Sequence, residues 1–294
     1  MTPASASADI LRRAAAAAGI DPTDAAPLRT GSNDIFELRN GIIARIGKPN
    51  SIDTAERELQ VSRWLNVSGI PTVEASESRY RPTVVDNRPV TWWRLIPDHR
   101  PSTPAELGAA LRRLHVLDPP TTFELPQYQP FARVLEELSA ATAIGDEDQK
   151  WLIQHYSTLR QQYEQLPPAE RKAVIHGDAW QGNLIVSHSG TPVFLDLDKV
   201  SIGRPEWDLV QLAVDHTDFT RLTAADYRSF VAAYGGHDMT TSTMFRLFAD
   251  IQELRWTTFA IGLSHRDESA RAEAAHRIAC LRGYIAKPWV WNAL

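Results

Sequence analysis

The amino-acid sequence predicts an α+β protein with two lobes, a small lobe rich in antiparallel strands and a larger lobe that is mostly helical. In the first third of the chain, short segments of β type surround a single long helical segment. A polar, proline-rich stretch at 97–106, PDHRPSTPAE, then separates this part from a helical remainder. One strand–loop–strand insert interrupts the helical part. We therefore expect the lobes to comprise residues 1–97 and 98–294.

The predicted small lobe begins with a helix and a β-hairpin. The segment ADILRRAAAAAGI reads as an amphipathic helix that ends at Gly19, a residue type common after helices. Two apolar segments, Ile35–Leu38 and Ile42–Ile46, flank the dipeptide Asn40-Gly41. Because Asn-Gly is the strongest short hairpin signal, these segments are expected to pair as antiparallel strands.

A second helix and a second pair of strands complete the predicted small lobe. Ser51 is a suitable N-cap, and this helix is expected to end near Gly69, two positions before Pro71. Two segments rich in β-branched and aromatic residues, Thr83–Val85 and Val90–Ile96, read as strands. Thr103 then opens the large lobe with a capping box that has proline at the first helical position.

Composition excludes several classes of function. The chain has 294 residues, of which 43% are hydrophobic and 23% charged, as in an ordinary globular protein. Its net charge of −5 provides no electrostatic basis for binding nucleic acid or an anionic membrane. No apolar run approaches the roughly 18 residues of a membrane span. The single cysteine, Cys280, permits no internal disulfide, and we expect it to be buried in a cytoplasmic protein.

The stretch VIHGDAWQGNLIV, at 174–186, carries the polar residues from which we infer chemistry. It places Asp178 and Asn183 in a loop between two short apolar strands, where rigid elements often present functional groups. A further apolar segment, VFLDLD, contains Asp196 and ends at Asp198. If this segment forms a hairpin with the preceding strand, Asp196 returns to the loop that contains Asp178 and Asn183.

These three side chains would provide the parts that phosphoryl transfer needs. Carboxylate and amide oxygens, as in Asp196 and Asn183, are hard ligands that magnesium takes at nucleotide sites, together with water and phosphate oxygens. A further carboxylate, Asp178, can accept the proton of an attacking hydroxyl group. Metal charge and an oriented nucleophile are the main requirements of this reaction. The residues therefore favour a phosphotransferase over the alternative of a capped surface loop with buried carboxylates.

The segments HGDAWQGN and FLDLDKVSIGRPEWDL resemble the aminoglycoside phosphotransferase and choline kinase family, a branch of the protein kinase-like fold. The spacing Asp-x-x-x-x-Asn is the same as in the catalytic loop of protein kinases. The resemblance extends to GSNDIFEL, RNGIIARIG, AERELQVSRWL and LGAALRRLH, and so covers residues 30–212. It implies a bilobal protein kinase-like fold, with a nucleotide-binding lobe at 1–97 and a catalytic and substrate-binding lobe at 98–294.

The resemblance also implies roles for the acidic and amide side chains. Asp178 corresponds to the catalytic base that deprotonates the acceptor hydroxyl. Asn183 and Asp196 correspond to the magnesium ligands, with Asp198 as a further candidate. Asp208 corresponds to an acid that holds the catalytic loop in place.

The implied nucleotide site lies in the small lobe. Arg45 occupies the position of the lysine of protein kinases, and Glu58 is its expected partner, although an ordinary salt bridge would look the same in the sequence. Arginine can bind phosphate through two N–H groups and keeps its charge. The phosphate-covering loop lacks the usual glycine pattern. The residues expected to bind the nucleotide are Gly31, Ser32, Arg45, Glu58 and the backbone groups of Arg94 and Ile96.

The implied activity is transfer of the γ-phosphoryl group of ATP, with Mg²⁺, to a hydroxyl of a small molecule such as an aminoglycoside-like antibiotic, an amino sugar or an amino alcohol. A protein kinase is disfavoured because six residues separate Asp196 from Gly203, too few for an activation segment. A nucleotide-binding pseudokinase that acts by protein contact is the alternative from another class. Several acids either face a cationic substrate or lie on solvated helix faces: Asp215, Asp218, Asp226, Asp250 and Glu253.

Overall fold

The computed structural model of the chain describes residues 3–29, 31, 33–39, 41–76 and 81–294. The chain forms two compact units that interleave along the sequence. Unit 1 comprises Met1–Ser102, Pro120–Phe123 and Gln181–Val200, and unit 2 comprises Thr103–Pro119, Glu124–Trp180 and Ser201–Leu294. The lobe boundary expected after residue 97 stays a prediction.

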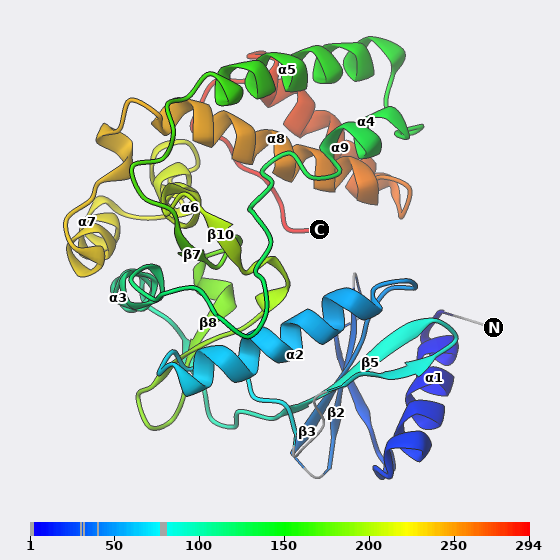
Figure 1. The fold of residues 1–294 in the computed structure, drawn as a ribbon. Helices are drawn as coiled ribbons and strands as arrows, with labels where there is room; N and C mark the ends of the chain where they lie inside the picture. Colours follow the sequence, from blue (N-terminus) through cyan, green and yellow to red (C-terminus); the bar gives the residue numbers. More distant parts are fainter. Residues whose placement is uncertain (1–2, 30, 32, 40, 77–80) are drawn as a thin grey trace. The chain divides into compact units, whose positions relative to one another are not determined.

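Unit 1 contains a five-stranded antiparallel sheet in the order β1–β2–β3–β5–β4 and a three-stranded sheet in the order β6–β8–β9. Two α-helices and two short 3₁₀ helices accompany these sheets in the described part of the unit (Figure 1). The elements are α1 (Pro3–Ala18), β1 (Ala26–Arg29), β2 (Asp34–Leu38), β3 (Ile42–Ile46), α2 (Ile52–Val67), β4 (Thr83–Val85), β5 (Arg88–Arg94), β6 (Arg100–Pro101), η1 (Gln181–Asn183), β8 (Leu184–Val186), β9 (Pro192–Phe194) and η2 (Leu197–Lys199).

The expected hairpin joins β2 to β3, with Ile35 opposite Arg45. In its turn, Gly41 has a φ of 68°, a conformation that favours glycine, and Asn40 lies outside the described residues. The cap predicted for α2 does not form as expected. Ser51 precedes the helix, but its hydroxyl donates to the carbonyl oxygen of Lys48 at 2.8 Å instead of accepting from a helical N–H group.

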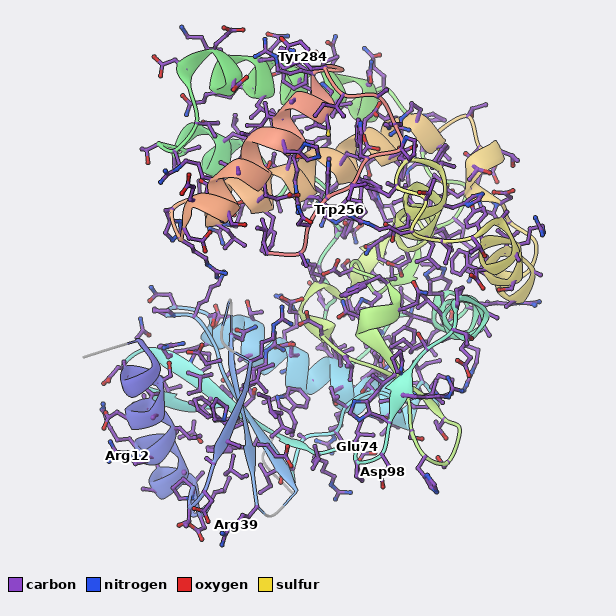
Figure 2. The ribbon with its side chains drawn as sticks, turned by 180° about the vertical axis from the view of Figure 1, so that it is seen from behind. Arg12, Arg39, Glu74, Asp98, Trp256 and Tyr284 are labelled. Atoms are coloured by element: carbon purple, nitrogen blue, oxygen red, sulfur yellow. The ribbon has the colours of Figure 1, made fainter. Side chains whose placement is uncertain are left out.

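Helices α1 and α2 pack on opposite faces of the larger sheet (Figure 1). Leu11 of α1 is buried in one core with Ala44 of β3. Arg45 points to the other face, because successive side chains of a strand alternate, and there it contacts Glu58 of α2. Arg12 lies on the exposed side of α1, with 69% of its side chain accessible (Figure 2).

The smaller sheet of unit 1 corrects two expectations. The predicted linker contains β6, which pairs with β8. The strand predicted over 193–198 ends at Phe194, because Asp196 adopts a left-handed backbone conformation with a φ of 55°. Phe194 also bonds to the segment after α2, since its N–H donates to the carbonyl of Pro71 and its carbonyl accepts from Val73, both at 3.0 Å.

Unit 2 is mostly helical and contains one two-stranded antiparallel sheet, β7–β10. The predicted capping box of α3 is present: the N–H of Glu106 donates to the Thr103 hydroxyl, and the N–H of Thr103 donates to the Glu106 carboxylate. Gly108 lets α3 approach α7 closely, because a Cβ there would lie 2.5 Å from the carbonyl oxygen of Phe230. The elements are α3 (Pro104–His115), α4 (Val134–Ser139), α5 (Asp146–Glu164), β7 (Ala173–Ile175), β10 (Ser201–Gly203), α6 (Glu206–Thr217), α7 (Ala224–Tyr234), η3 (Met239–Thr241), α8 (Phe245–Leu263) and α9 (Glu268–Leu281).

The C-terminal end of unit 2 departs from the expectation of helices to the end of the chain. The last helix ends at Leu281, and residues 282–294 form turns and an extended segment. Cys280 is buried near the end of α9, as expected. Over the residues that the structure describes, no helix combines the length and the apolar character that crossing a membrane requires.

Candidate active site

An ion-pair cluster joins three elements of unit 1. Arg45 of β3 contacts Glu58 of α2 through Nη1 and Oε1 at 2.5 Å. The second terminal nitrogen of Arg45 contacts Oδ1 of Asp196, after β9, at 3.1 Å. Only 16% of the Arg45 side chain and 6% of the Glu58 side chain are exposed. The expected pairing is therefore formed, and it is a buried pair whose partners are costly to separate.

Burial and neighbouring charge shift the protonation equilibria of this cluster. Burial raises the pKa of Glu58 to about 7, against the effect of Arg45 and with a further contribution from Asp198 and Asp196. Burial alone would lower the pKa of Arg45, but attraction to Glu58, Asp196 and Asp198 outweighs it, so the pKa is raised. The guanidinium therefore stays charged and is held in place by acids from two directions.

The turn that contains Asp196 is held by two neighbouring elements. Asp196 has a φ of 55° and a ψ of 65°, a region that L-residues seldom adopt and that occurs often at functional positions. The N–H of Leu195 donates to the carbonyl oxygen of Asn183 at 2.9 Å. Arg57 of α2 donates to the carbonyl oxygen of Asp198 at 3.2 Å. The expected hairpin therefore brings the backbone of Asn183 next to the residue before Asp196.

The residues expected as magnesium ligands are Asn183 and Asp196. They flank the open end of the β8–β9 hairpin, one before β8 and one after β9, and have an amide oxygen and a carboxylate, both of which are hard ligands. Among the described residues, no group of three or more His, Cys, Asp or Glu side chains is placed to hold a metal ion. At nucleotide sites magnesium takes few protein ligands and completes its shell with phosphate and water, so a two-residue set fits this metal.

In unit 2, the loop that carries Asp178 is anchored by Asp208 of α6. The carboxylate of Asp208 is fully buried and accepts hydrogen bonds from the N–H groups of His176 at 2.6 Å and Gly177 at 2.7 Å. Hydrogen bonds to an ionised carboxylate are stronger than neutral ones. Asp178 follows directly and is half-buried. The contacts of Asp208 are those expected of an acid that holds this loop.

A buried chain of polar side chains extends this anchor. The ring of His115, at the end of α3, lies 3.0 Å from the Asp208 carboxylate through Nε2 and 2.8 Å from the Tyr234 hydroxyl through Nδ1. The sequence analysis does not identify this link, because His115 and Asp208 are 93 residues apart and belong to different helical patterns. The local sequence offers only the dipeptide Leu-His at the end of an amphipathic helix, which does not indicate a partner for the histidine.

The remaining residues expected at a nucleotide site lie in unit 1. Gly31 is exposed shortly before β2, and Ser32 lies outside the described residues. Arg94 ends β5, and its N–H donates to the carbonyl oxygen of Glu74 at 2.8 Å. The carbonyl oxygen of Ile96 accepts a hydrogen bond from Nδ1 of His99 at 2.8 Å. Adenine binding by Arg94 and Ile96 stays a prediction.

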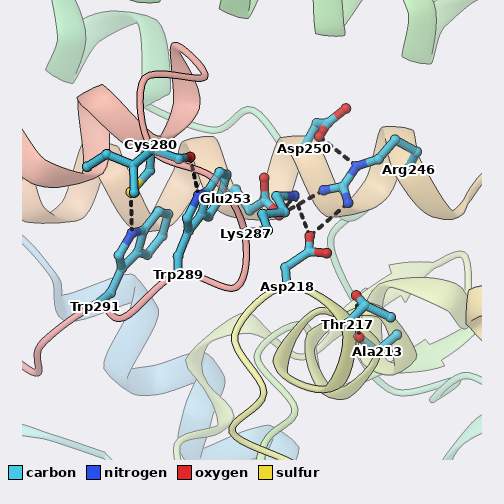
Figure 3. A network of polar contacts seen from close by, with 11 residues as sticks. Ala213, Thr217, Asp218, Arg246, Asp250, Glu253, Cys280, Lys287, Trp289 and Trp291 are labelled. Carbon is cyan, nitrogen blue, oxygen red and sulfur yellow. Dashed lines mark hydrogen bonds and ion pairs between the residues drawn. The ribbon is translucent and has the colours of Figure 1, made fainter.

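The acids considered for a cationic substrate have partners within unit 2. Asp218 and Glu253 are buried, and Lys287 contacts them at 2.6 and 3.0 Å, respectively (Figure 3). Arg246 contacts the same two carboxylates, each at 2.7 Å. The other contacts are Asp215 with Arg221, Asp250 with Arg246, and Asp226 with Thr223. The four carboxylates that contact Arg or Lys side chains therefore do not require a cationic ligand for neutralisation, whereas Asp226 contacts only a neutral hydroxyl among these partners.

Comparison with known proteins gives a family and a fold. The model of the APH phosphotransferase enzyme family matches residues 25–278. A protein of Lactiplantibacillus plantarum called "Probable ketoamine kinase" is 36% identical over 85 residues, a match that spans 27% of this chain and 28% of that protein.

Three solved structures resemble the chain over most of its length. The amicoumacin kinase hAmiN superimposes with a TM-score of 0.72 at 14% identity, covering 97% of each chain. A choline/ethanolamine kinase family protein from Mesorhizobium loti gives 0.64 at 18% identity, covering 95% of this chain and 96% of the other. The aminoglycoside phosphotransferase APH(3'')-Id from Streptomyces rimosus gives 0.62 at 18% identity, covering 86% and 99%. The predicted bilobal protein kinase-like fold is confirmed, and with the family match over residues 25–278 the chain belongs to the APH phosphotransferase enzyme family.

Proposed function

We propose that this kinase transfers the γ-phosphoryl group of ATP to a hydroxyl group of a small molecule. The observation that carries the proposal is the cluster in which Arg45 joins Glu58 to Asp196. A buried, fixed guanidinium next to a carboxylate metal ligand is suited to the phosphates of a nucleotide and their counterion.

In the proposed reaction, the acceptor oxygen attacks the γ-phosphorus while the bond to the ADP oxygen breaks, in a single in-line step. Asp178 accepts the proton of the acceptor hydroxyl. Arg45 binds phosphate oxygens, and Glu58 orients it. Asn183 and Asp196 would hold magnesium, which when bound supplies positive charge at the phosphate oxygens.

Further contacts with the nucleotide are proposed for four other residues of unit 1. Gly31 and Ser32 would cover the phosphates, and the backbone groups of Arg94 and Ile96 would bind adenine. Support comes from hAmiN, whose structure contains AMP-PNP and Ca²⁺ and whose fold this chain shares.

For the acceptor we propose an amino sugar, an amino alcohol or an aminoglycoside-like molecule. The names of the similar proteins support this class, since they refer to ketoamine, choline or ethanolamine, and aminoglycoside. Asp218 and Glu253 are already paired with cationic side chains of unit 2. We therefore expect other groups to bind the amine of such an acceptor.

A screen for phosphorylated products tests the proposed function. Purified protein is incubated with ATP and magnesium and with a panel of aminoglycosides, amino sugars and amino alcohols, and products are identified by mass spectrometry. Asp178→Asn should lower turnover by a factor on the order of 10²–10⁴, the usual contribution of a positioned base, and should leave ATP binding in calorimetry unchanged. Near wild-type turnover of Asp178→Asn would remove the assigned role. ATP binding without product or ADP release would favour a pseudokinase.

A further inference from the structure

A line of hydrogen bonds in unit 2 leads from α8 to the residue before Asp178. Arg255 of α8 donates through Nη1 to the hydroxyl oxygen of Tyr128 at 2.5 Å. The Tyr128 hydroxyl in turn donates to the carbonyl oxygen of Gly177 at 3.4 Å. The same nitrogen of Arg255 donates to Oε1 of Gln252 at 2.9 Å, which fixes the guanidinium on its helix.

These contacts add a second hydrogen bond to Gly177, at its carbonyl oxygen. Its N–H donates to Asp208 at 2.7 Å, and its carbonyl accepts from Tyr128. Gly177 has a φ of 79°, a backbone conformation that favours glycine. The hydrogen bonds of its N–H and carbonyl groups maintain the turn at this residue. The Gly177 carbonyl and the N–H of Asp178 belong to one planar peptide unit. Fixing that carbonyl therefore fixes the plane from which the Asp178 side chain departs.

Tyr128 is well placed for this role because its backbone and ring are themselves held. Its N–H donates to the carbonyl oxygen of Ile202 in β10 at 2.9 Å. Its ring packs on Trp207, with centroids 5.4 Å apart. The next residue of β10, Gly203, has no side chain, and a Cβ there would lie 2.9 Å from the Cβ of Tyr128. Glycine at this position thus lets Tyr128 lie close over the strand.

Arg255 strengthens the contact between Tyr128 and Gly177. A guanidinium that donates to a phenol oxygen polarises the O–H bond and makes the hydroxyl a better donor. Within the described parts of the chain, no carboxylate forms an ion pair with Arg255, and the Tyr128 hydroxyl and Gln252 are the protein groups that accept from its Nη1.

We propose that Tyr128 and Arg255 are positioning residues of the kinase reaction, which fix the peptide unit preceding Asp178. The proposal rests on the proposed function, in which Asp178 is the base, and adds to it two residues distant in sequence from the catalytic loop. Their effect is on the orientation of the base and therefore on turnover, whereas nucleotide binding in unit 1 is not expected to depend on them.

Tyr128→Phe tests the proposal, because it keeps the ring on Trp207 and removes only the hydroxyl. Turnover should fall roughly 3- to 10-fold, as expected for the loss of one hydrogen bond, with the KM for ATP and the melting temperature unchanged. Arg255→Met should lower turnover in the same way, and Arg255→Lys should restore part of it. The double variant Tyr128→Phe/Arg255→Met should lose little more than the larger single loss, since the two residues act as a unit.

Tyr163→Phe is the matched control, because Tyr163 also packs on Trp207, at 5.9 Å between centroids, and has no contact with Gly177 among those described. Hydrogen exchange of the peptide containing Gly177 and Asp178 gives a readout that does not require an acceptor, and exchange should be faster in Tyr128→Phe only. Unchanged turnover and exchange in Tyr128→Phe, or equal changes in Tyr163→Phe, would overturn the proposal. If the wild type shows no turnover, the proposed function fails, and the exchange comparison still decides whether Tyr128 fixes the loop.

Discussion

At position 45, the forked side chain of arginine makes two separate ion pairs. Arg45 reaches Glu58 with one terminal nitrogen and Asp196 with the other, so its two contacts point in different directions. Lysine would have one terminal nitrogen for these contacts and would lose the planar fork of the guanidinium. Arginine therefore connects the strand, the helix and the turn after β9 through two ion pairs.

We expect Arg45→Ala to raise the KM for ATP and to lower turnover, since contacts to a transferring phosphoryl group act partly in the transition state. Arg45→Lys should retain more activity, because the charge remains although the two-pronged contact is lost. Glu58→Ala should be milder and should add little to Arg45→Ala. ATP kinetics of the four variants, including the double one, check this expectation. Fully additive losses would show that Glu58 does not act through Arg45.

Helix α1 is a structural part of unit 1. It lies outside residues 25–278, the part that matches the family model, yet it covers one face of the larger sheet. Ser7 donates to the carboxylate of Asp34, at the start of β2, at 2.5 Å, and Arg88 of β5 contacts the same carboxylate at 3.2 Å. The helix is therefore part of the core and part of the polar contacts at the edge of the β2–β3 hairpin.

Leu11→Ala should destabilise the protein by about 2–5 kcal/mol, the usual cost of truncating a buried leucine, because Leu11 is only 3% exposed in the core under α1. Arg12→Ala, one residue further and on the exposed side of the same helix, should change the free energy of unfolding by less than about 0.5 kcal/mol. Urea unfolding of both variants provides the measurement. Similar values for the two would mean that α1 is not packed on the sheet.

For the molecule as a whole, the network of Asp218, Glu253, Arg246 and Lys287 links stability to pH. Burial raises the pKa of Glu253 to about 8, and its hydrogen bond with Asp218 acts in the same direction, against the two cations. Burial would also raise the pKa of Asp218, but its hydrogen bonds with Glu253, Lys287 and Arg246 outweigh this effect and lower it. Of the two acids, Asp218 therefore loses its proton more readily, and Glu253 binds its proton more tightly than an ordinary glutamate.

Between pH 5 and 8, roughly the window between the unfolded and folded pKa of Glu253, the native protein keeps a proton that the unfolded chain releases. The free energy of unfolding should therefore fall as pH rises through this window. Glu253→Gln cannot release that proton, so its stability should fall less steeply, as urea unfolding at pH 5, 6.5 and 8 would measure. Asp218 acts in the opposite sense but only below its ordinary pKa of 3.8. Glu58, whose pKa is also raised, is present in the wild type and in Glu253→Gln, so its contribution to the pH dependence is the same in both. Equal slopes would mean that Glu253 is charged throughout.

Local patterns in the sequence predict much of this molecule, and contacts between distant segments account for the rest. The β2–β3 hairpin and the capping box at Thr103 follow from turn and cap residues that act within a few positions. The left-handed turn at Asp196 was not predicted, because it depends on Arg57 and on the paired backbone of Asn183. Tyr128 could not be identified either, since its hydroxyl meets a loop 49 residues later.

The composition of unit 1 has a consequence for how the protein is made. On the ribosome, the sheet β1–β5 is synthesised long before residues 181–200, which supply β8, β9 and the turn of Asp196. At the usual elongation rates, this delay after residue 102 lasts roughly 5–20 seconds. During that time the nascent chain contains β6 without its partner β8 and Arg45 without Asp196. Unit 1 is therefore completed only after about two thirds of the 294 residues have been translated, although its sheet β1–β5 is synthesised within the first 102.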